Sequence, residues 1–150
     1  MPTETTKLIR HAALNLLARR EHSPKELLDK LKHKGFQPDL IQSILDNLIE
    51  QKLLSVSRFI ENYIEARRKK GFGPLHIRAE LSARGISSDD IQQYLMLNDD
   101  IWFEEAKSAW QKRFKNKFPQ NSKERAQHMR FLQSRGFTSE QMAFVVVESN

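Results

Sequence analysis

The sequence predicts an all-α protein made of three tandem three-helix units. Three of its five glycines, Gly35, Gly85 and Gly136, lie 50 and 51 residues apart. Each has a leucine four residues before it and an apolar residue directly after it. Shared flanks at a fixed spacing indicate an internal repeat. No segment reads as a credible strand, and we expect the units at residues 1–54, 55–98 and 99–150.

A longer helix opens each unit, at about residues 5–20, 57–70 and 101–117. In the first two of these helices, apolar residues recur at i, i+1, i+4 and i+5, which places them on one buried face. In the third, they recur mainly in steps of four. The residues expected on these buried faces are Leu8, Ile9, Ala12, Ala13, Leu16 and Leu17; Phe59, Ile60, Tyr63 and Ile64; and Trp102, Ala106, Trp110, Phe114 and Phe118.

A shorter second helix ends at each repeated glycine. Its start in the first unit, residues 23–26, has the form of a capping box with proline at the first helical position. Residues 121–124 keep this spacing in the third unit, and Gly73-Pro74 takes the place in the second. The repeated glycine fits the left-handed C′ position of a Schellman turn, with the apolar residue after it folding back. We therefore expect a helix and a tight turn in every unit.

A third helix begins about three residues after each glycine, at Pro38 and within residues 87–90 and 138–141, where first-turn acids or caps suit a helix start. The run 145–147 is β-prone, but its place in the repeat favours a helix. We expect joints at residues 52–57 and 97–100 and a loosened place at 118–121. Because such short helices are marginal alone, each trio must pack together.

Positive charge is concentrated in one stretch of this chain of net charge +6. From Lys107 to Arg135, nine lysines and arginines face a single acid, Glu124, so this stretch carries +8 and the rest −2. A second run, residues 67–70, closes a helix just before Gly71. Cations stabilise a helix C-terminus, but four in a row also suit a bound anion, and both interpretations stay open. A negatively charged partner is expected.

Aromatic residues alternate with these cations, and Trp110, Phe114 and Phe118 are of the type that stacks on bases. Their four-residue spacing favours a place in the core instead. The residues that we expect to contact a partner or DNA are Arg67, Arg68, Lys69, Lys70, Arg78, Arg84, Lys112, Arg113, Lys115, Lys117, Arg130 and Arg135.

Catalysis has no visible constellation in this sequence. It has no cysteine, which excludes disulfides and thiol nucleophiles and suits a reducing compartment. Its five histidines include no i, i+4 pair, and its acidic pairs stand side by side at helix starts, where capping accounts for them. Phosphate-binding glycine loops are missing. We expect no enzyme activity, cofactor or metal, and, without a transmembrane run or signal peptide, a cytoplasmic monomer.

The segment RFIENYIEARRKKGFGPLHIRAELSARGI, residues 58–86, resembles the signature of the RecX family, bacterial regulators of the RecA recombinase. The segments ALNLLARREHSPKELLDKLKHKGF and FLQSRGF resemble the family's first and last units, so the likeness spans nearly the whole chain. One departure is Ser55-Val56, where members usually have an acidic pair.

This resemblance implies three tandem units in a curved, elongated molecule that lies in the groove of the RecA filament on DNA. It also implies inhibition of RecA ATP hydrolysis, strand exchange and co-protease activity, in DNA repair and the SOS response. Single- or double-stranded DNA is a further candidate partner. The alternative is a direct nucleic-acid-binding protein, because a short helix, tight turn and second helix resemble helix-turn-helix units.

Overall fold

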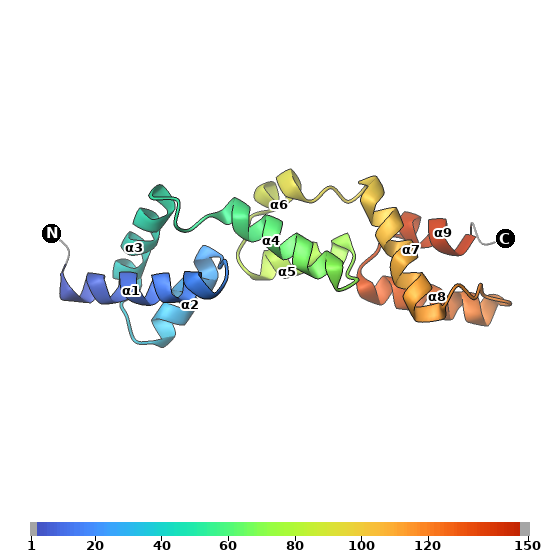
Figure 1. Ribbon diagram of the computed structural model, residues 1–150, viewed down its shortest axis with the longest axis horizontal. Helices are drawn as coiled ribbons and strands as arrows, with labels where there is room; N and C mark the ends of the chain where they lie inside the picture. The colour runs from blue at the N-terminus through green and yellow to red at the C-terminus, as the bar shows by residue number, and fades with distance from the viewer. Residues whose placement is uncertain (1–2, 148–150) are drawn as a thin grey trace.

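Three bundles of three helices stand in a row and give an elongated molecule (Figure 1). This computed structural model describes residues 3–147, which form nine helices and no strand. The helices that pack extensively on one another belong to the same bundle. We call the bundles repeats 1, 2 and 3. Their helices are α1 (Glu4–Arg19), α2 (Pro24–His33) and α3 (Pro38–Glu50); α4 (Val56–Lys69), α5 (Pro74–Ala83) and α6 (Ser88–Tyr94); and α7 (Asp100–Phe114), α8 (Ser122–Arg135) and α9 (Ser139–Val147).

The repeated glycines end α2, α5 and α8 as the sequence predicts. The φ angles of Gly35, Gly85 and Gly136 are 98°, 84° and 96°, values that residues other than glycine rarely adopt. In each turn, the N–H after the glycine donates to the carbonyl of the leucine four residues before it, at 3.1–3.3 Å. Gly71 makes a fourth such turn at the end of α4, with φ of 90° and a bond from Phe72 to the Arg67 carbonyl.

Side-chain caps begin most of the helices. Ser23 and Glu26 form the complete capping box of α2, in which each side chain accepts from the other residue's backbone N–H. Asn121 accepts from the Glu124 N–H at the start of α8. Pro74 opens α5 after Gly73. Local hydrogen bonds of this kind satisfy N–H groups that the helix itself leaves unpaired.

Two details of the sequence prediction are wrong. The first helix of repeat 3 ends at Phe114 rather than Lys117, because Lys115 and Asn116 both take the left-handed conformation. Leu8 and Phe118, both expected on buried helix faces, are 57% and 44% exposed, and Phe118 lies beyond the end of α7. Among the described helices, α2 and α3 are those that pack extensively on α1, and the apolar face of α1 is wider than the surface that they cover.

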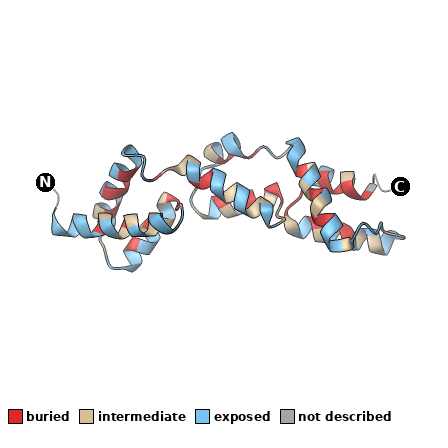
Figure 2. Ribbon diagram, viewed as in Figure 1, coloured by how far each residue is buried: buried red, intermediate tan, exposed pale blue. Residues whose placement is uncertain are grey.

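Buried residues occur in all three repeats (Figure 2), and their apolar side chains form two separate cores. One lies within repeat 1 and is built by residues such as Ile9, Leu27 and Leu48. The other is continuous through repeats 2 and 3, and Ile77, Trp110 and Phe137 belong to it. Repeats 2 and 3 therefore share a core, whereas repeat 1 folds around its own.

Candidate partner-binding surface

The two basic segments of the sequence meet at a cleft of about 220 Å³ between the end of α4 and the faces of α7 and α8. Lys70 at the end of one segment and Lys107 at the start of the other are 37 positions apart in the chain, and the junction of repeats 2 and 3 brings the segments together. Lysine and arginine are the only charged residue types in the lining. We call this site the basic cleft; its lining residues are Arg68, Lys69, Lys70, Gly71, Ser108, Ala109, Lys112, Arg113, Phe131 and Arg135.

Backbone contacts fix the geometry of the basic cleft. The Gly73 N–H donates to the Arg135 carbonyl at 2.7 Å, and the Leu75 N–H to the Gly136 carbonyl at 2.9 Å. A Cβ at Gly73 would lie 2.6 Å from the Gly136 oxygen, closer than real Cβ atoms approach. Gly73 therefore has no room for a side chain, and the φ of Gly136 favours glycine. Together these contacts hold the end of α8 against the start of α5.

Arg67 and Arg68 are engaged inside the protein. Arg67 donates two hydrogen bonds to the Glu80 carboxylate, at 2.9 and 3.1 Å. Burial raises the pKa of Glu80, but hydrogen bonds from Arg67 and Tyr63 outweigh it, and this pKa lies below its usual value. Arg68 bridges Glu65 at 2.6 Å and Glu105 at 2.9 Å. The bond to Glu105 joins α4 to α7, so part of this basic run holds repeats 2 and 3 together.

Arg84 has a similar structural role at the junction of repeats 1 and 2. Its guanidinium donates to the Glu80 carbonyl at 3.1 Å and lies 4.8 Å from the centre of the Tyr63 ring. It also lies 3.7 Å from the carboxylate of Glu26, across the junction of repeats 1 and 2. Carboxylates of this chain thus lie beside four of the twelve residues expected to contact a partner: Arg67, Arg68, Lys69 and Arg84.

Four cations of the basic cleft have no carboxylate partner among the described residues: Lys70, Lys112, Arg113 and Arg135. Lys69 also lines it, 73% exposed and 3.6 Å from Glu65. With no acid in the lining, these charges repel one another and favour a bound anion. A carboxylate or a phosphate group suits the cleft.

Aromatic rings order the arginines of the basic cleft. Arg113 and Arg135 lie 5.9 and 5.4 Å from the centre of the Phe131 ring, and Arg135 also lies 5.2 Å from that of Phe72. Arg67 lies over the same Phe72 ring at 4.2 Å. Cation–π contacts hold a guanidinium without neutralising it. The two free arginines are therefore positioned and still charged.

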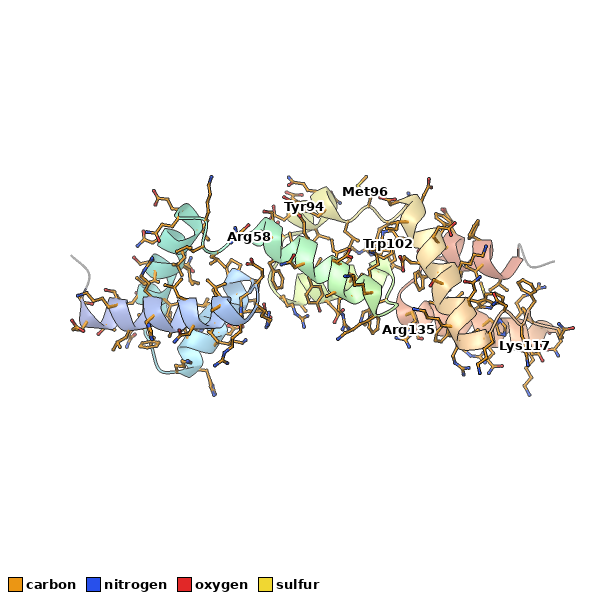
Figure 3. The ribbon with its side chains drawn as sticks, in the orientation of Figure 1. Arg58, Tyr94, Met96, Trp102, Lys117 and Arg135 are labelled. Carbon is orange, nitrogen blue, oxygen red and sulfur yellow. The ribbon has the colours of Figure 1, made fainter. Side chains whose placement is uncertain are left out.

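The remaining predicted contact residues lie outside the basic cleft. Lys115 and Lys117 line a second hollow of about 580 Å³ on repeat 3. Arg130 is exposed on α8, and Arg78 lies on α5 in repeat 2. Figure 3 shows Arg135 and Lys117 on the same lower edge of the molecule. The cations of repeat 3 thus extend the charged surface past the basic cleft.

The aromatic residues of α7, and Phe118 after it, pack mainly against the protein interior, the role that their spacing favours. Trp110 is 2% exposed, and its indole N–H donates to Nδ1 of His128 at 2.9 Å. Phe114 stacks on the same imidazole at 3.6 Å, and Phe118 stacks on Trp110 at 4.9 Å although it is 44% exposed. Burial lowers the pKa of His128. This histidine is a packed side chain.

Sequence reasoning missed the residues that organise the basic cleft, namely Phe72, Glu105 and Phe131. The turn at Gly71 had a local signal, since the glycine follows a helix that ends in cations. The aromatic and acidic partners gave none, because they come from other helices. Within residues 3–147, no cluster of potential metal ligands occurs, and no helix is long and apolar enough to cross a membrane.

A row of three-helix repeats defines the molecule as a tandem-repeat helical protein. Models of the first, second and third three-helix domains of RecX match residues 10–48, 57–95 and 99–146. The chain belongs to the RecX family.

Relatives and solved structures agree with this assignment. The chain is 39% identical to "Regulatory protein RecX" of Pseudomonas fluorescens Pf-5, over 93% of this chain and 90% of that protein. It is 43% identical to that of Pseudomonas putida KT2440, over 89% and 86%. The crystal structure of RecX from Lactobacillus salivarius superposes with a TM-score of 0.83 at 22% identity, covering 97% of each chain. A second crystal structure, of regulatory protein RecX, gives 0.80 at 22% identity over 95% and 71%.

Proposed function

We propose that this protein is a cytoplasmic regulator that binds the RecA filament on DNA and inhibits its ATP hydrolysis, strand exchange and co-protease activity without catalysing a reaction itself. DNA repair and the SOS response are the setting that this function implies. Membership of the RecX family supports the proposal, as do relatives named regulatory proteins. The single observation that carries the binding mode is the basic cleft, with four cations that no described carboxylate neutralises.

The proposed mechanism needs binding alone. A monomer with its repeats in a row reaches several subunits of a polymer, so weak contacts add through effective concentration. A protein that prefers one state of the filament shifts the equilibrium toward that state by its difference in affinity. Because the proposed contacts join cations of this protein to carboxylates or phosphates of the partner, salt screens them, and we expect the affinity to fall as salt concentration rises.

Lys70, Lys112, Arg113 and Arg135 are the contact residues that we propose first, because their charges are free. Lys69, Lys115, Lys117 and Arg130 extend this surface. Arg67, Arg68 and Arg84 hold the repeats in place, so a loss of function after their substitution would mix two causes. Arg78 belongs to a different surface, described below.

The test is RecA ATPase activity on single-stranded DNA, titrated with the wild-type protein and with a K70E/K112E variant. Both lysines are exposed, and their side chains have no ion-pair partner among the described residues, so the variant should fold normally. We expect inhibition to require about tenfold more of the variant, which corresponds to about 1.4 kcal/mol. The matched control is K32E/K34E, which changes the same charge on exposed residues of repeat 1.

The outcomes separate the proposals. A wild-type protein that leaves the ATPase unchanged would overturn the regulatory function. Equal inhibition by K70E/K112E and the control would remove the basic cleft from the binding mode. Direct nucleic-acid binding is the competing function, favoured by the same free cations, and it predicts tight, sequence-dependent DNA binding without recombinase.

A further inference from the structure

A groove of about 770 Å³ lies on repeat 2 between α5, α6 and the segment that leads to α7. Ile91 and Leu95 are buried at its base, and Met96 is 63% exposed beside them. Small side chains on α5 and α6 leave room for close approach of another chain. We call it the apolar groove; its other lining residues are Arg78, Ala79, Ser82, Ser88, Gln92, Leu97 and Asn98.

Comparison of the repeats explains why the apolar groove is open. Helices α2 and α5 each have ten residues and begin at a proline, so position 28 corresponds to 78. By the same count along the sequence, position 48 of α3 matches position 98, which lies beyond the end of α6. In repeat 1, Leu28 packs against the core and Leu48 is fully buried. Repeat 2 has Arg78 in the place of Leu28 and Asn98 at the sequence position of Leu48, both exposed. Two apolar side chains that close repeat 1 are thus absent from repeat 2.

Helix length contributes as well. The third helix of repeat 1 has 13 residues, whereas α6 has seven and ends at Tyr94. The segment after α6, which forms one wall of the apolar groove, is held in place by hydrogen bonds. The buried Gln141 of α9 donates to the Leu97 carbonyl at 2.7 Å, and the Asp99 N–H donates to the Met96 carbonyl. The apolar groove is therefore preformed, which lowers the entropic cost of filling it.

We propose that the apolar groove binds an amphipathic helix of a protein partner, with apolar side chains in the places that Leu28 and Leu48 fill in repeat 1 and an acidic residue beside them. We expect an acidic residue on the partner helix because Arg78 is the only charged residue in the lining and has no ion pair with another described residue. Flexible methionine at the rim and small residues on the walls suit a docked helix.

A protein helix fits this surface better than nucleic acid does. One cation among uncharged side chains gives little attraction for a phosphate backbone. Figure 3 shows Tyr94 and Met96 on the upper edge of the molecule, with Arg135 and Lys117 on the lower edge. The two edges can be occupied together. This inference rests on the proposed function, since the helix would belong to a subunit of the recombinase filament.

The test fills the apolar groove. Ala79 is exposed on α5, so A79W should fold and block the site. We expect filament affinity, measured by co-sedimentation, to fall at least about tenfold, with thermal unfolding unchanged. The control is A18W, an equal change at an exposed alanine of α1. R78E should weaken binding in the same direction, and its control is R19E on α1.

A photo-cross-linking residue at position 96 gives a measurement that does not depend on these variants. We expect it to join a recombinase helix that carries apolar and acidic residues, identified by mass spectrometry. A cross-link to DNA, or to a second copy of this chain with a dimer in sedimentation, would overturn the inference. So would wild-type affinity in folded A79W. Failure of wild-type protein to bind filaments would instead count against the proposed function.

Discussion

The two junctions between repeats are built from different interactions. At the junction of repeats 1 and 2, the contacts are polar: Arg58 pairs with Glu21 at 2.9 Å, and the Ser23 hydroxyl donates to the Arg84 carbonyl at 2.8 Å. The buried cores on its two sides are separate. At the junction of repeats 2 and 3, one core runs through, and Phe137 is 1% exposed within it.

This difference predicts two kinds of behaviour in one chain. Apolar burial and backbone hydrogen bonds change little with ionic strength, whereas partly exposed ion pairs are screened by salt and contribute about 0–1 kcal/mol each. The Arg58 and Glu21 side chains are 46% and 23% exposed. We infer that repeats 2 and 3 move as one body, which keeps the basic cleft intact, while repeat 1 is an adjustable arm.

The largest expected effect comes from G136A, a substitution at the junction of repeats 2 and 3, which we call the apolar junction. A Cβ there would collide with the backbone and Cβ of His76, and φ is 96°. We expect about 2–5 kcal/mol of destabilisation from left-handed strain and overpacking together, seen in thermal unfolding. The control is G35A, with φ of 98° and nothing within 4 Å, which should cost only about 1–2 kcal/mol. Equal losses would show that the tight contact is unimportant.

A smaller effect is expected from R58A, which removes the ion pair between Arg58 and Glu21 at the junction of repeats 1 and 2, which we call the polar junction. The chain has no cysteine, so introduced pairs can carry labels for distance measurements. Labels at positions 50 and 93 span the polar junction, and labels at 93 and 133 span the apolar one. We expect R58A, or a rise from about 0.05 M to about 0.5 M salt, to broaden only the first distance distribution. Broadening of both would contradict the separation of rigid and adjustable parts.

The smallest effect concerns His22, which is 1% exposed in repeat 1 beside the polar junction. Burial lowers its pKa below 6.5, so the unfolded chain binds the proton more readily. The resulting stability is present above pH 6.5 and is lost as pH falls through the folded-state pKa. We expect H22Q to flatten this decline in hydrogen exchange of α1–α3. An unchanged pH profile would mean that His22 does not contribute to it.

Helix ends were predicted well because their signals are local. A glycine at C′, a Ser or Asn cap and an apolar period act within about one turn, and Gly35, Ser23 and Asn121 do what the sequence indicates. The helix end at Phe114 was missed because Lys115, a residue without a turn signal, takes φ of 54°. The exposure of Leu8 was missed because periodicity marks a face and does not say how much of it is covered.

The candidate site was predicted only in outline. Charge counting found both basic segments, but it treated their residues alike. The structure divides them: Arg68 is bound by Glu65 and Glu105, while Lys70 and Lys112 lie free in the same cleft. Nothing near Arg68 in the sequence identifies Glu105, 37 residues away, as its partner. An ion pair between helices depends on how the helices pack.

By itself, the sequence determined the repeat, the helices, their caps and the positive charge of the last third of the chain, since backbone conformation is decided by neighbouring residues. Tertiary structure alone decided which cations remain free, that repeats 2 and 3 share a core, and that Gly73 meets Gly136. These features depend on distances between residues far apart in the chain, and only the packing of one helix on another sets those distances.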